Sequence, residues 1–340
     1  MKKIVKYRNG NYIVTIYEDG TKTRSSNKDL SIEDLKPKFP ESIDLKITNK
    51  CTHNCPFCYE SSKYNGKDAS LEMLNNKKFI KSIHKGTELA IGGGNPVRVN
   101  DEFANSMEKF LIKMKKKKVI CNITWNPCIE NMSDFLSEFS QLMKWQKMNL
   151  IKGIGVSLSH FDNIDTSRFE YLSKLNNVVY HTIAGISTAE DIIKIYNYTH
   201  RPILVLGYKT VGRGASSLSY KNKSLINLYD ESLHHYSQQS IYDILVRCHV
   251  SFDNLAIEQL ELKKIIPEDV WAKNYLGKDG NFSMYIDLVR ETYSDCSLVA
   301  RDNQRSLKDV GFNIRKAFED IRKNPIGFNV IDKSLIKKEE

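Results

Sequence analysis

Hydrophobic and polar positions follow one pattern before residue 41 and another after it. Residues 3–24 contain short alternating runs separated by Asn9-Gly10 and Asp19-Gly20, two dipeptides that close tight hairpins. This pattern predicts a small β-meander. The polar stretch behind it carries Pro37 and Pro40, which predicts a linker arm that ends the N-terminal part, residues 1–40.

From residue 41 onwards, apolar strand-like runs alternate with segments of helical periodicity, as in βα units around a parallel sheet. The predicted strands are 42–49, 87–91, 118–125, 152–158, 177–184, 202–208, 247–254 and 282–289. The predicted helices are 70–85, 102–116, 131–147, 167–175, 188–199, 223–238, 256–265 and 312–323. Helix N-caps are expected at Asp101 and at Ser187 or Thr188.

These elements predict an α/β protein built as a (β/α) barrel, complete or partly open, with six to eight parallel strands. The barrel is expected over residues 41–300, and a helical tail over residues 301–340. In such barrels the chemistry is carried at the C-terminal ends of the strands and in the loops behind them. That rule selects the candidate residues below.

Composition adds little to this picture and excludes some classes. The chain is 41% hydrophobic and 27% charged, ordinary values for a globular protein. Its net charge of +10 comes mostly from dispersed lysines, whereas base recognition relies on arginine forks, so a nucleic-acid partner has weak support. No apolar run approaches the ~20 residues that span a bilayer, and no apolar segment of a signal peptide follows the N-terminus. We therefore expect a cytoplasmic protein without a membrane partner.

The most informative stretch is Cys51-Thr-His-Asn-Cys55-Pro-Phe57-Cys58, directly behind the first predicted barrel strand. Three thiolates in one loop can hold an iron–sulfur cubane and leave one iron without a protein ligand. An open coordination position is typical of a catalytic metal site. The alternative is a structural zinc site with His53 or a distant cysteine as fourth ligand. Zinc sites usually pair two ligand arms, and this chain has one.

This spacing, with the aromatic Phe57 before the last cysteine, resembles the signature of the radical S-adenosylmethionine superfamily. The resemblance covers about residues 42–215 and implies the same barrel. It implies that Cys51, Cys55 and Cys58 ligate a [4Fe-4S] cluster whose open iron binds S-adenosylmethionine. Reductive cleavage then yields a 5′-deoxyadenosyl radical that abstracts hydrogen from a substrate. An electron donor such as flavodoxin or ferredoxin is implied as a partner.

A second part of the resemblance follows the second barrel strand. The residues Gly92, Gly93, Gly94, Asn95 and Pro96 stand where the family has a Gly-Gly-Glu motif whose backbone binds the amino group of S-adenosylmethionine. Consecutive glycines allow close approach of the backbone to a ligand, because no Cβ intervenes. Gly94 departs from the family glutamate, so a carboxylate contact is lost, and Asn95 is a candidate substitute.

The remaining candidates follow later strands. Ser157 and Ser159 share one strand face, where the family binds ribose hydroxyls. Phe57 and Tyr59 are expected near the adenine. Lys209 and Arg213 are candidates to bind the carboxylate of S-adenosylmethionine or an anionic substrate.

Several polar and sulfur-bearing residues have weaker support. His160 and Asp162 are candidate substrate contacts, with a satisfied cap or loop hydrogen bond as the alternative. Asp253 and Asp287 are further candidates, with a solvated or ion-paired loop residue as the alternative. The other four cysteines, Cys121, Cys128, Cys248 and Cys296, lack the C-x2-C spacing of an auxiliary cluster. The sequence does not identify a catalytic residue.

We therefore expect a radical S-adenosylmethionine enzyme that acts on a peptide or protein side chain, or on a small molecule. The peptide is favoured because Gly212-Arg213-Gly214 resembles a segment of peptide-modifying members. One alternative is modification of a nucleotide or RNA base. Others are a protein that binds a zinc ion or cluster only for structure, and a degenerate member without turnover.

Overall fold

The computed structural model describes residues 2–215, 238–275 and 277–327, which form one small and one large β-sheet. The small sheet is the antiparallel meander of β1 (Lys3–Asn9), β2 (Tyr12–Tyr17) and β3 (Lys22–Ser25). Gly10 and Gly20 have φ angles of +65° and +89°, the left-handed conformation that the predicted turns require. The predicted meander is confirmed.

The large sheet contains eight parallel strands and two short antiparallel ones at one edge. The parallel strands are β4 (Ser42–Thr48), β5 (Glu88–Gly93), β6 (Ile120–Trp125), β7 (Gly153–Ser157), β8 (Val178–Ile183), β9 (Ile203–Leu206), β10 (Val250–Phe252) and β11 (Ser283–Asp287). The antiparallel strands are β12 (Thr292–Ser294) and β13 (Arg305–Ser306). All eight predicted barrel strands are present.

The sequence predicted a barrel that is either complete or partly open, and the order of the strands shows the partly open form. It runs β10-β9-β8-β7-β6-β5-β4-β11-β12-β13. The last parallel strand, β11, therefore lies beside the first, β4, while β10 ends the order on the other side. A closed barrel would join β10 to β11, and within the described residues that pairing is absent.

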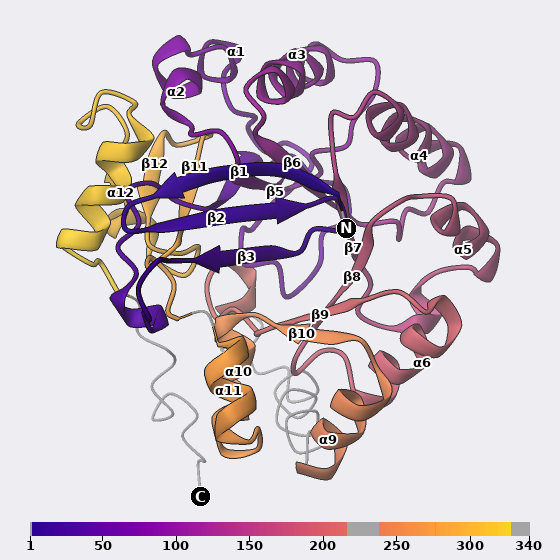
Figure 1. Ribbon diagram of the computed structural model, residues 1–340. Helices are drawn as coiled ribbons and strands as arrows, with labels where there is room; N and C mark the ends of the chain where they lie inside the picture. The colour runs from indigo at the N-terminus through magenta and orange to yellow at the C-terminus, as the bar shows by residue number, and fades with distance from the viewer. Residues whose placement is uncertain (1, 216–237, 276, 328–340) are drawn as a thin grey trace, which may run out of the picture.

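Helices lie around the large sheet, and the meander crosses in front of it (Figure 1). They are α1 (Leu71–Leu74), α2 (Lys77–Ser82), α3 (Glu102–Lys116), α4 (Met132–Lys147), α5 (Thr166–Ser173), α6 (Ala189–Thr199), α9 (Gln238–Arg247), α10 (Asn254–Gln259), α11 (Glu268–Asn274) and α12 (Ile314–Lys323). In the described part of the chain, none is both long and apolar enough to span a membrane.

The predicted helix starts are confirmed where the sequence has a clear N-cap residue. Asp101 caps α3 by accepting from Ala104 N at 2.6 Å, and Thr188 caps α6 in a capping box with Asp191. The single helix expected over 70–85 is two helices, because the side chain of Asn76 caps a new start at α2. Most of the helix predicted over 223–238 lies outside the described residues. The prediction over 256–265 missed the break after α10 and the additional helix α11.

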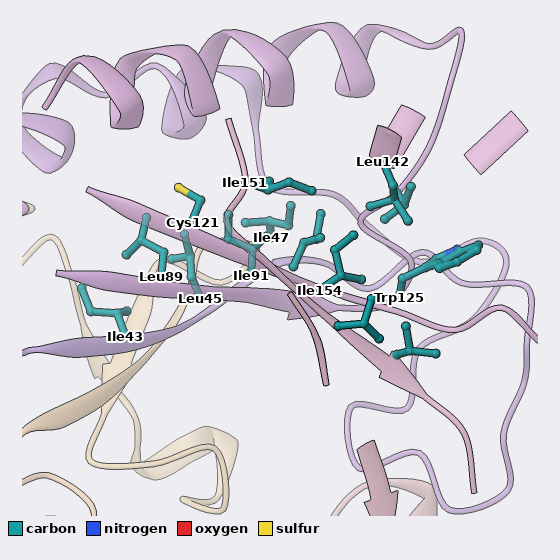
Figure 2. Close-up of a cluster of buried hydrophobic side chains, with 14 of the residues drawn as sticks. Ile43, Leu45, Ile47, Leu89, Ile91, Cys121, Trp125, Leu142, Ile151 and Ile154 are labelled. Carbon is teal, nitrogen blue, oxygen red and sulfur yellow. The ribbon is translucent and has the colours of Figure 1, made fainter. Parts of the chain in front are cut away.

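One face of the barrel sheet packs against the helices. Ile43, Leu45 and Ile47 of β4 point to this face, and Figure 2 shows them packed with Leu89 and Ile91 of β5. Alternation then directs Asp44, Lys46 and Thr48 to the concave face inside the barrel. Asp44 and Ala90 are exposed although they lie on central strands. The concave face is therefore open to solvent.

The meander covers the N-terminal edge of this barrel. Its apolar residues, such as Tyr12 and Val14, pack with Ile120 at the start of β6 and with Phe282 just before β11. Arg24 of β3 donates to both carboxylate oxygens of the buried Glu41 at 3.0 and 2.8 Å, just before β4. With this edge covered, the C-terminal ends of the strands are the accessible side of the barrel.

Candidate active site

The three motif cysteines lie on one loop at the C-terminal end of β4. Backbone hydrogen bonds join the two ends of the loop, from Cys51 N to Lys63 O and from Lys63 N to Asn49 O, each 3.0 Å. Within it, Cys58 N donates to Cys55 O at 3.2 Å. The three thiols are half-buried, whereas Cys121, Cys248 and Cys296 are buried. The loop thus presents its sulfur atoms on the accessible side of the barrel.

The three thiols lie near enough to influence one another. Burial raises the pKa of Cys55 to about 11, and the neighbouring charges of Cys58 and Cys51 raise it further. Burial also raises the pKa of Cys51, with a contribution from Cys58. Thiols crowded in this way are stabilised as thiolates by a bound cation, so the donor chemistry fits an iron–sulfur cluster.

A site for a single metal ion, such as zinc, would need several ligand side chains to converge on one point. Within residues 2–215, 238–275 and 277–327, no three His, Cys, Asp or Glu side chains converge closely enough to hold one ion. A cluster places each thiolate on a separate iron and does not need such convergence. His53, the fourth ligand in the zinc alternative, bonds to the backbone of Cys128, and its buried Nε2 has no hydrogen-bond partner among the residues that the structure describes.

Residues 212–214 hold the cysteine loop from the far side of the barrel. The guanidinium of Arg213 donates from Nε to Cys55 O at 2.9 Å and from Nη1 to Ser62 O at 2.7 Å. Its backbone nitrogen also donates to Cys58 O at 3.1 Å. Arg213 was predicted to bind a carboxylate. In the structure its side chain instead donates to backbone carbonyls of the cysteine loop.

The two glycines beside Arg213 each lie close to a backbone carbonyl, which leaves no space for a side chain. A Cβ at Gly212 would lie 2.2 Å from Tyr59 O, and Gly212 has a φ of +60°. A Cβ at Gly214 would lie 2.2 Å from Lys209 O and 3.4 Å from Phe57 O. Gly212 therefore allows the segment to lie against the cysteine loop, whereas Gly214 leaves space for the carbonyl of Lys209 in its own segment.

The glycine triplet after β5 packs against the chain that leads into the same loop. Gly94 N donates to Thr48 O at 2.7 Å, and Asn95 N donates to Lys50 O at 2.8 Å. A Cβ at Gly93 would lie 2.3 Å from Thr48 O, and one at Gly94 would lie 2.3 Å from Lys50 O. Gly94 therefore stands at a position where this backbone admits no side chain. Gly92 has open space around it, and Pro96 is buried.

Asn95 reaches a carboxylate that the sequence analysis missed. Its Nδ2 donates to Glu138 Oε1 of α4 at 2.6 Å, and Trp125 Nε1 donates to Glu138 Oε2 at 2.6 Å. Burial raises the pKa of Glu138 to about 7, although both hydrogen bonds lower it. Nothing in the local sequence marks Glu138, because a glutamate within an amphipathic helix is ordinarily a solvated residue.

A buried ion network joins β4, β11 and the end of the cysteine loop. The Lys46 ammonium lies 2.5 Å from Glu60 Oε2 and 2.9 Å from Asp287 Oδ2, and all three side chains are at most 6% exposed. Tyr285 donates its hydroxyl to Glu60 Oε1 at 2.8 Å. Asp287, a candidate substrate contact, is thus ion-paired, which was its alternative. Sequence analysis missed Lys46 and Glu60. The pair of Lys46 with Asp287 depends on β11 lying beside β4.

Lys209 extends into the barrel interior. Its ammonium lies 4.0 Å from the centre of the Tyr59 ring and donates to Ser297 Oγ at 2.8 Å. Its charge also lowers the pKa of Asp44. Although Asp44 is accessible to solvent, its position inside the barrel, where protein atoms surround it, raises this pKa to about 6. Lys209 and Tyr59, both predicted site residues, are therefore together. Phe57 is half-buried in the same loop.

The serine pair lies at the end of β7. Ser157 and Ser159 are half-exposed while Leu158 between them is buried, so the predicted shared face is present. Ser157 is in register with His181 of β8, whose pKa burial lowers to about 4. A Cβ at Gly155 would lie 2.2 Å from the His181 ring, so this glycine leaves the space that the imidazole occupies.

Of the other polar candidates, His160 and Asp253 bond to protein groups, and Asp162 is exposed to solvent. His160 Nδ1 lies 3.1 Å from Asp191 Oδ2, an interaction that raises the pKa of His160. Asp162 is exposed. Asp253 caps α10 by accepting from Ala256 N at 2.8 Å, and it also accepts from Gly207 N at 2.9 Å. Asp253 is therefore a helix cap, and not the solvated or ion-paired loop residue that was the alternative to a substrate contact.

Comparisons with known proteins bear on the fold. No protein-family model matches the chain, and no curated protein sequence does. It is similar to a crystal structure of Streptococcus suis SuiB bound to S-adenosylmethionine, with 16% identity and a TM-score of 0.52, over 84% of this chain and 68% of that one. It is also similar to SuiB bound to the precursor peptide SuiA, with 15% identity and a TM-score of 0.50, over 86% and 75% of the chains.

At these identities the similarity establishes the fold. The chain has the fold of radical S-adenosylmethionine enzymes, a partly open barrel preceded here by a three-stranded meander. The fold class predicted from the sequence is confirmed.

Proposed function

We propose that this protein is a radical S-adenosylmethionine enzyme in which Cys51, Cys55 and Cys58 ligate a [4Fe-4S] cluster. The observation that carries the proposal is the cysteine loop itself. It lies at the C-terminal end of the first barrel strand, and Arg213 holds it through three hydrogen bonds to its backbone carbonyls. Protein loops at this end of parallel barrels carry the chemistry, and SuiB shares the fold and binds S-adenosylmethionine.

In this proposal the cofactors supply electron transfer and the carbon radical, while the protein orients them. The backbone of residues 92–96 holds the amino group of S-adenosylmethionine. Ser157 and Ser159 bind the ribose hydroxyls, which need donors as well as acceptors. Phe57 and Tyr59 lie against the adenine. Lys209 neutralises a carboxylate, either of S-adenosylmethionine or of the substrate.

Arg213 has a different role from the one its charge suggested. Two of its side-chain nitrogens donate to backbone carbonyls of the cysteine loop. We therefore assign it to positioning the cluster ligands. The substrate in this proposal is a peptide or protein side chain, because the concave face is solvent-accessible at Asp44 and Ala90 and because SuiB is a structural neighbour in complex with a precursor peptide. The cytoplasm is the proposed compartment, with a flavodoxin or ferredoxin as electron donor.

Anaerobic reconstitution with iron and sulfide tests the proposal. The electron paramagnetic resonance spectrum is recorded after reduction with dithionite, with and without S-adenosylmethionine, and 5′-deoxyadenosine is quantified. A Cys51→Ala, Cys55→Ala, Cys58→Ala variant is measured beside a Cys128→Ala control, whose thiol lies outside the loop. We expect a reduced cubane signal that shifts with S-adenosylmethionine, and 5′-deoxyadenosine formation, both lost only in the triple variant.

Other outcomes would contradict the proposal at different levels. A cluster without 5′-deoxyadenosine would indicate a degenerate member of the superfamily. Bound zinc without a cluster would overturn the proposed function and support a structural metal site.

A further inference from the structure

The loop after β5 lacks a carboxylate of its own. A glutamate at position 94 would need a Cβ 2.3 Å from Lys50 O, which the observed backbone excludes. Another carboxylate lies at the same place. Glu138 of α4, which follows Asn95 by 43 residues, accepts a hydrogen bond of 2.6 Å from the Asn95 side chain.

This contact fixes the Asn95 side chain at both ends. Its Nδ2 donates to Glu138 Oε1, while its Oδ1 accepts from Val97 N at 3.1 Å. The Asn95 backbone nitrogen donates to Lys50 O, the residue before Cys51. Trp125 Nε1 holds the second carboxylate oxygen of Glu138 at 2.6 Å. The conformation of the glycine loop is therefore coupled to α4 and β6 through Glu138.

Glu138 and the cysteine loop also share a cavity. A cavity of about 240 Å³ is lined by Cys51, Asn95, Arg98 and Glu138, among others. Arg98 is already paired, with Asp68 at 3.0 and 2.8 Å and with Asp101 at 3.0 Å. Within the described residues, the hydrogen-bond partners of the Glu138 carboxylate are the neutral Asn95 and Trp125 side chains. Lys50 and Arg98 line the same cavity, but neither forms an ion pair with Glu138 in this part of the chain.

A second glutamate, Glu108, also accepts a hydrogen bond from a tryptophan but is in addition paired with a lysine. Glu108 of α3 also accepts from a tryptophan, Trp145 Nε1, at 3.1 Å, but the ammonium of Lys144 lies 2.6 Å away. Glu108 lines the outer groove between α3 and α4. Although burial opposes it, these bonds lower its pKa. Glu138, without such a cation and beside Cys51, retains the capacity to accept from a cationic ligand group.

We propose that Glu138 supplies, from α4, the negative charge that the loop lacks at Gly94: it holds Asn95 in place and stabilises the ammonium group of S-adenosylmethionine bound beside that loop. This inference rests on the proposed function. It makes Glu138 a positioning residue and Asn95 the side chain through which it acts on the loop.

The test measures the dissociation constant of S-adenosylmethionine for anaerobically reconstituted protein by equilibrium dialysis at pH 8.5. This pH lies above the pKa of Glu138, which burial raises to about 7, so the carboxyl group is ionised. Glu138→Gln keeps the shape of the side chain and removes its charge, and Glu108→Gln is the matched control. We expect binding weaker by about tenfold or more in Glu138→Gln, with unchanged iron content, and wild-type binding in Glu108→Gln.

A ligand change separates a direct electrostatic role from a merely structural one. An S-adenosyl analogue without the α-amino group should lose less affinity in Glu138→Gln than S-adenosylmethionine does, because only the contact with Asn95 is changed and the ammonium charge is absent. Equal loss of affinity for both ligands in Glu138→Gln would overturn the ammonium contact. Wild-type affinity of Glu138→Gln for S-adenosylmethionine would overturn the whole inference.

Two further measurements keep the outcome decisive. If Glu138→Gln does not fold or does not retain iron, Glu138→Asp and Asn95→Ala replace it. Glu138→Asp should then bind more tightly than Asn95→Ala, and wild-type affinity in Asn95→Ala would contradict the role of the loop contact. A wild-type protein that holds the cluster but does not bind S-adenosylmethionine would refute the proposed function itself, separately from this inference.

Discussion

The guanidinium Nε of Arg213 donates a hydrogen bond of 2.9 Å to the carbonyl of Cys55, 158 residues earlier in the chain. The contact connects the segment after β9 with the loop after β4, so the positions of the cysteines depend on a distant part of the barrel. Hydrogen bonds from a charged group to backbone carbonyls are stronger than neutral ones. The arrangement of the sulfur atoms is therefore a property of the assembled barrel and not of the loop alone.

Replacing Arg213 should loosen the cysteine loop. In Arg213→Ala, the carbonyls of Cys55 and Ser62 lose donors at 2.9 and 2.7 Å. Each carbonyl left unpaired costs about 1–3 kcal/mol. We expect a lower free energy of unfolding and less iron retained after gel filtration. Arg201→Ala is the control, because Arg201 bonds a helix carbonyl, Ser173 O, outside the loop. Equal iron retention in both variants would contradict the role given to Arg213.

Introducing a side chain at position 94 should destabilise the protein. A side chain there would place its Cβ 2.3 Å from Lys50 O, so Gly94→Glu and Gly94→Ala must displace backbone next to Cys51. Overpacking of this kind costs about 1–3 kcal/mol. Gly92→Ala is the matched control, because nothing lies within 4 Å of its Cβ position. Urea unfolding should therefore show a large loss for Gly94→Ala and a small one for Gly92→Ala. The reverse order would refute this description of the loop.

The buried ion network predicts a large effect for Lys46. In Lys46→Met, the carboxylates of Glu60 and Asp287 remain buried without their cation, which costs about 3–5 kcal/mol. The comparison is Lys144→Met, whose side chain is 51% exposed and pairs with Glu108, so its loss is below about 1 kcal/mol. Denaturant unfolding of both variants measures the difference. A loss of stability in Lys46→Met as small as in Lys144→Met would show that the network is not tightly coupled to folding.

The contact of His160 with Asp191 predicts a pH dependence of stability. The hydrogen bond to Asp191 raises the pKa of His160. A raised histidine pKa stabilises the fold fully below the unfolded value near 6.5, and this stabilisation disappears as the pH rises through the folded value. His160→Gln should therefore destabilise the protein more at pH 5.5 than at pH 8.5. Because the side chain is 40% exposed, the effect should stay below about 1 kcal/mol.

A double-mutant cycle isolates this pair. The coupling energy between His160→Gln and Asp191→Asn, obtained from urea unfolding, should be present at pH 5.5 and close to zero at pH 8.5. Equal coupling at both pH values would mean that the interaction does not depend on the histidine charge.

The fold was largely predictable, because its signals are local. The strand predictions followed apolar runs, and the caps at Asp101 and Thr188 mark true helix starts. The misplaced elements have local causes as well. Asn76 ends one helical stretch and caps another, which periodicity alone does not reveal. The short strand β13 is defined by pairing with β12 and carries little pattern of its own.

The site was predictable in part. Sequence reasoning brought the cysteines, the glycine triplet, Lys209 and Arg213 to one end of the barrel, because parallel strands end on the same side. It assigned Arg213 to a ligand, although the guanidinium bonds to Cys55 O and Ser62 O. It did not find Glu138 or Lys46, since a single charged residue in a helix or strand has no distinguishing pattern.

The sequence by itself determined the kind of fold, because the alternation of strands and helices depends on neighbouring residues. It also predicted the kind of chemistry, from the spacing of three cysteines. Only the tertiary structure decided the partners of the charged side chains. Burial makes an unpaired charge costly, so each buried charge tends to be paired or hydrogen-bonded by whichever residue the barrel brings near. That pairing joins Glu138 to Asn95 and Lys46 to Asp287, residues that lie far apart in the chain.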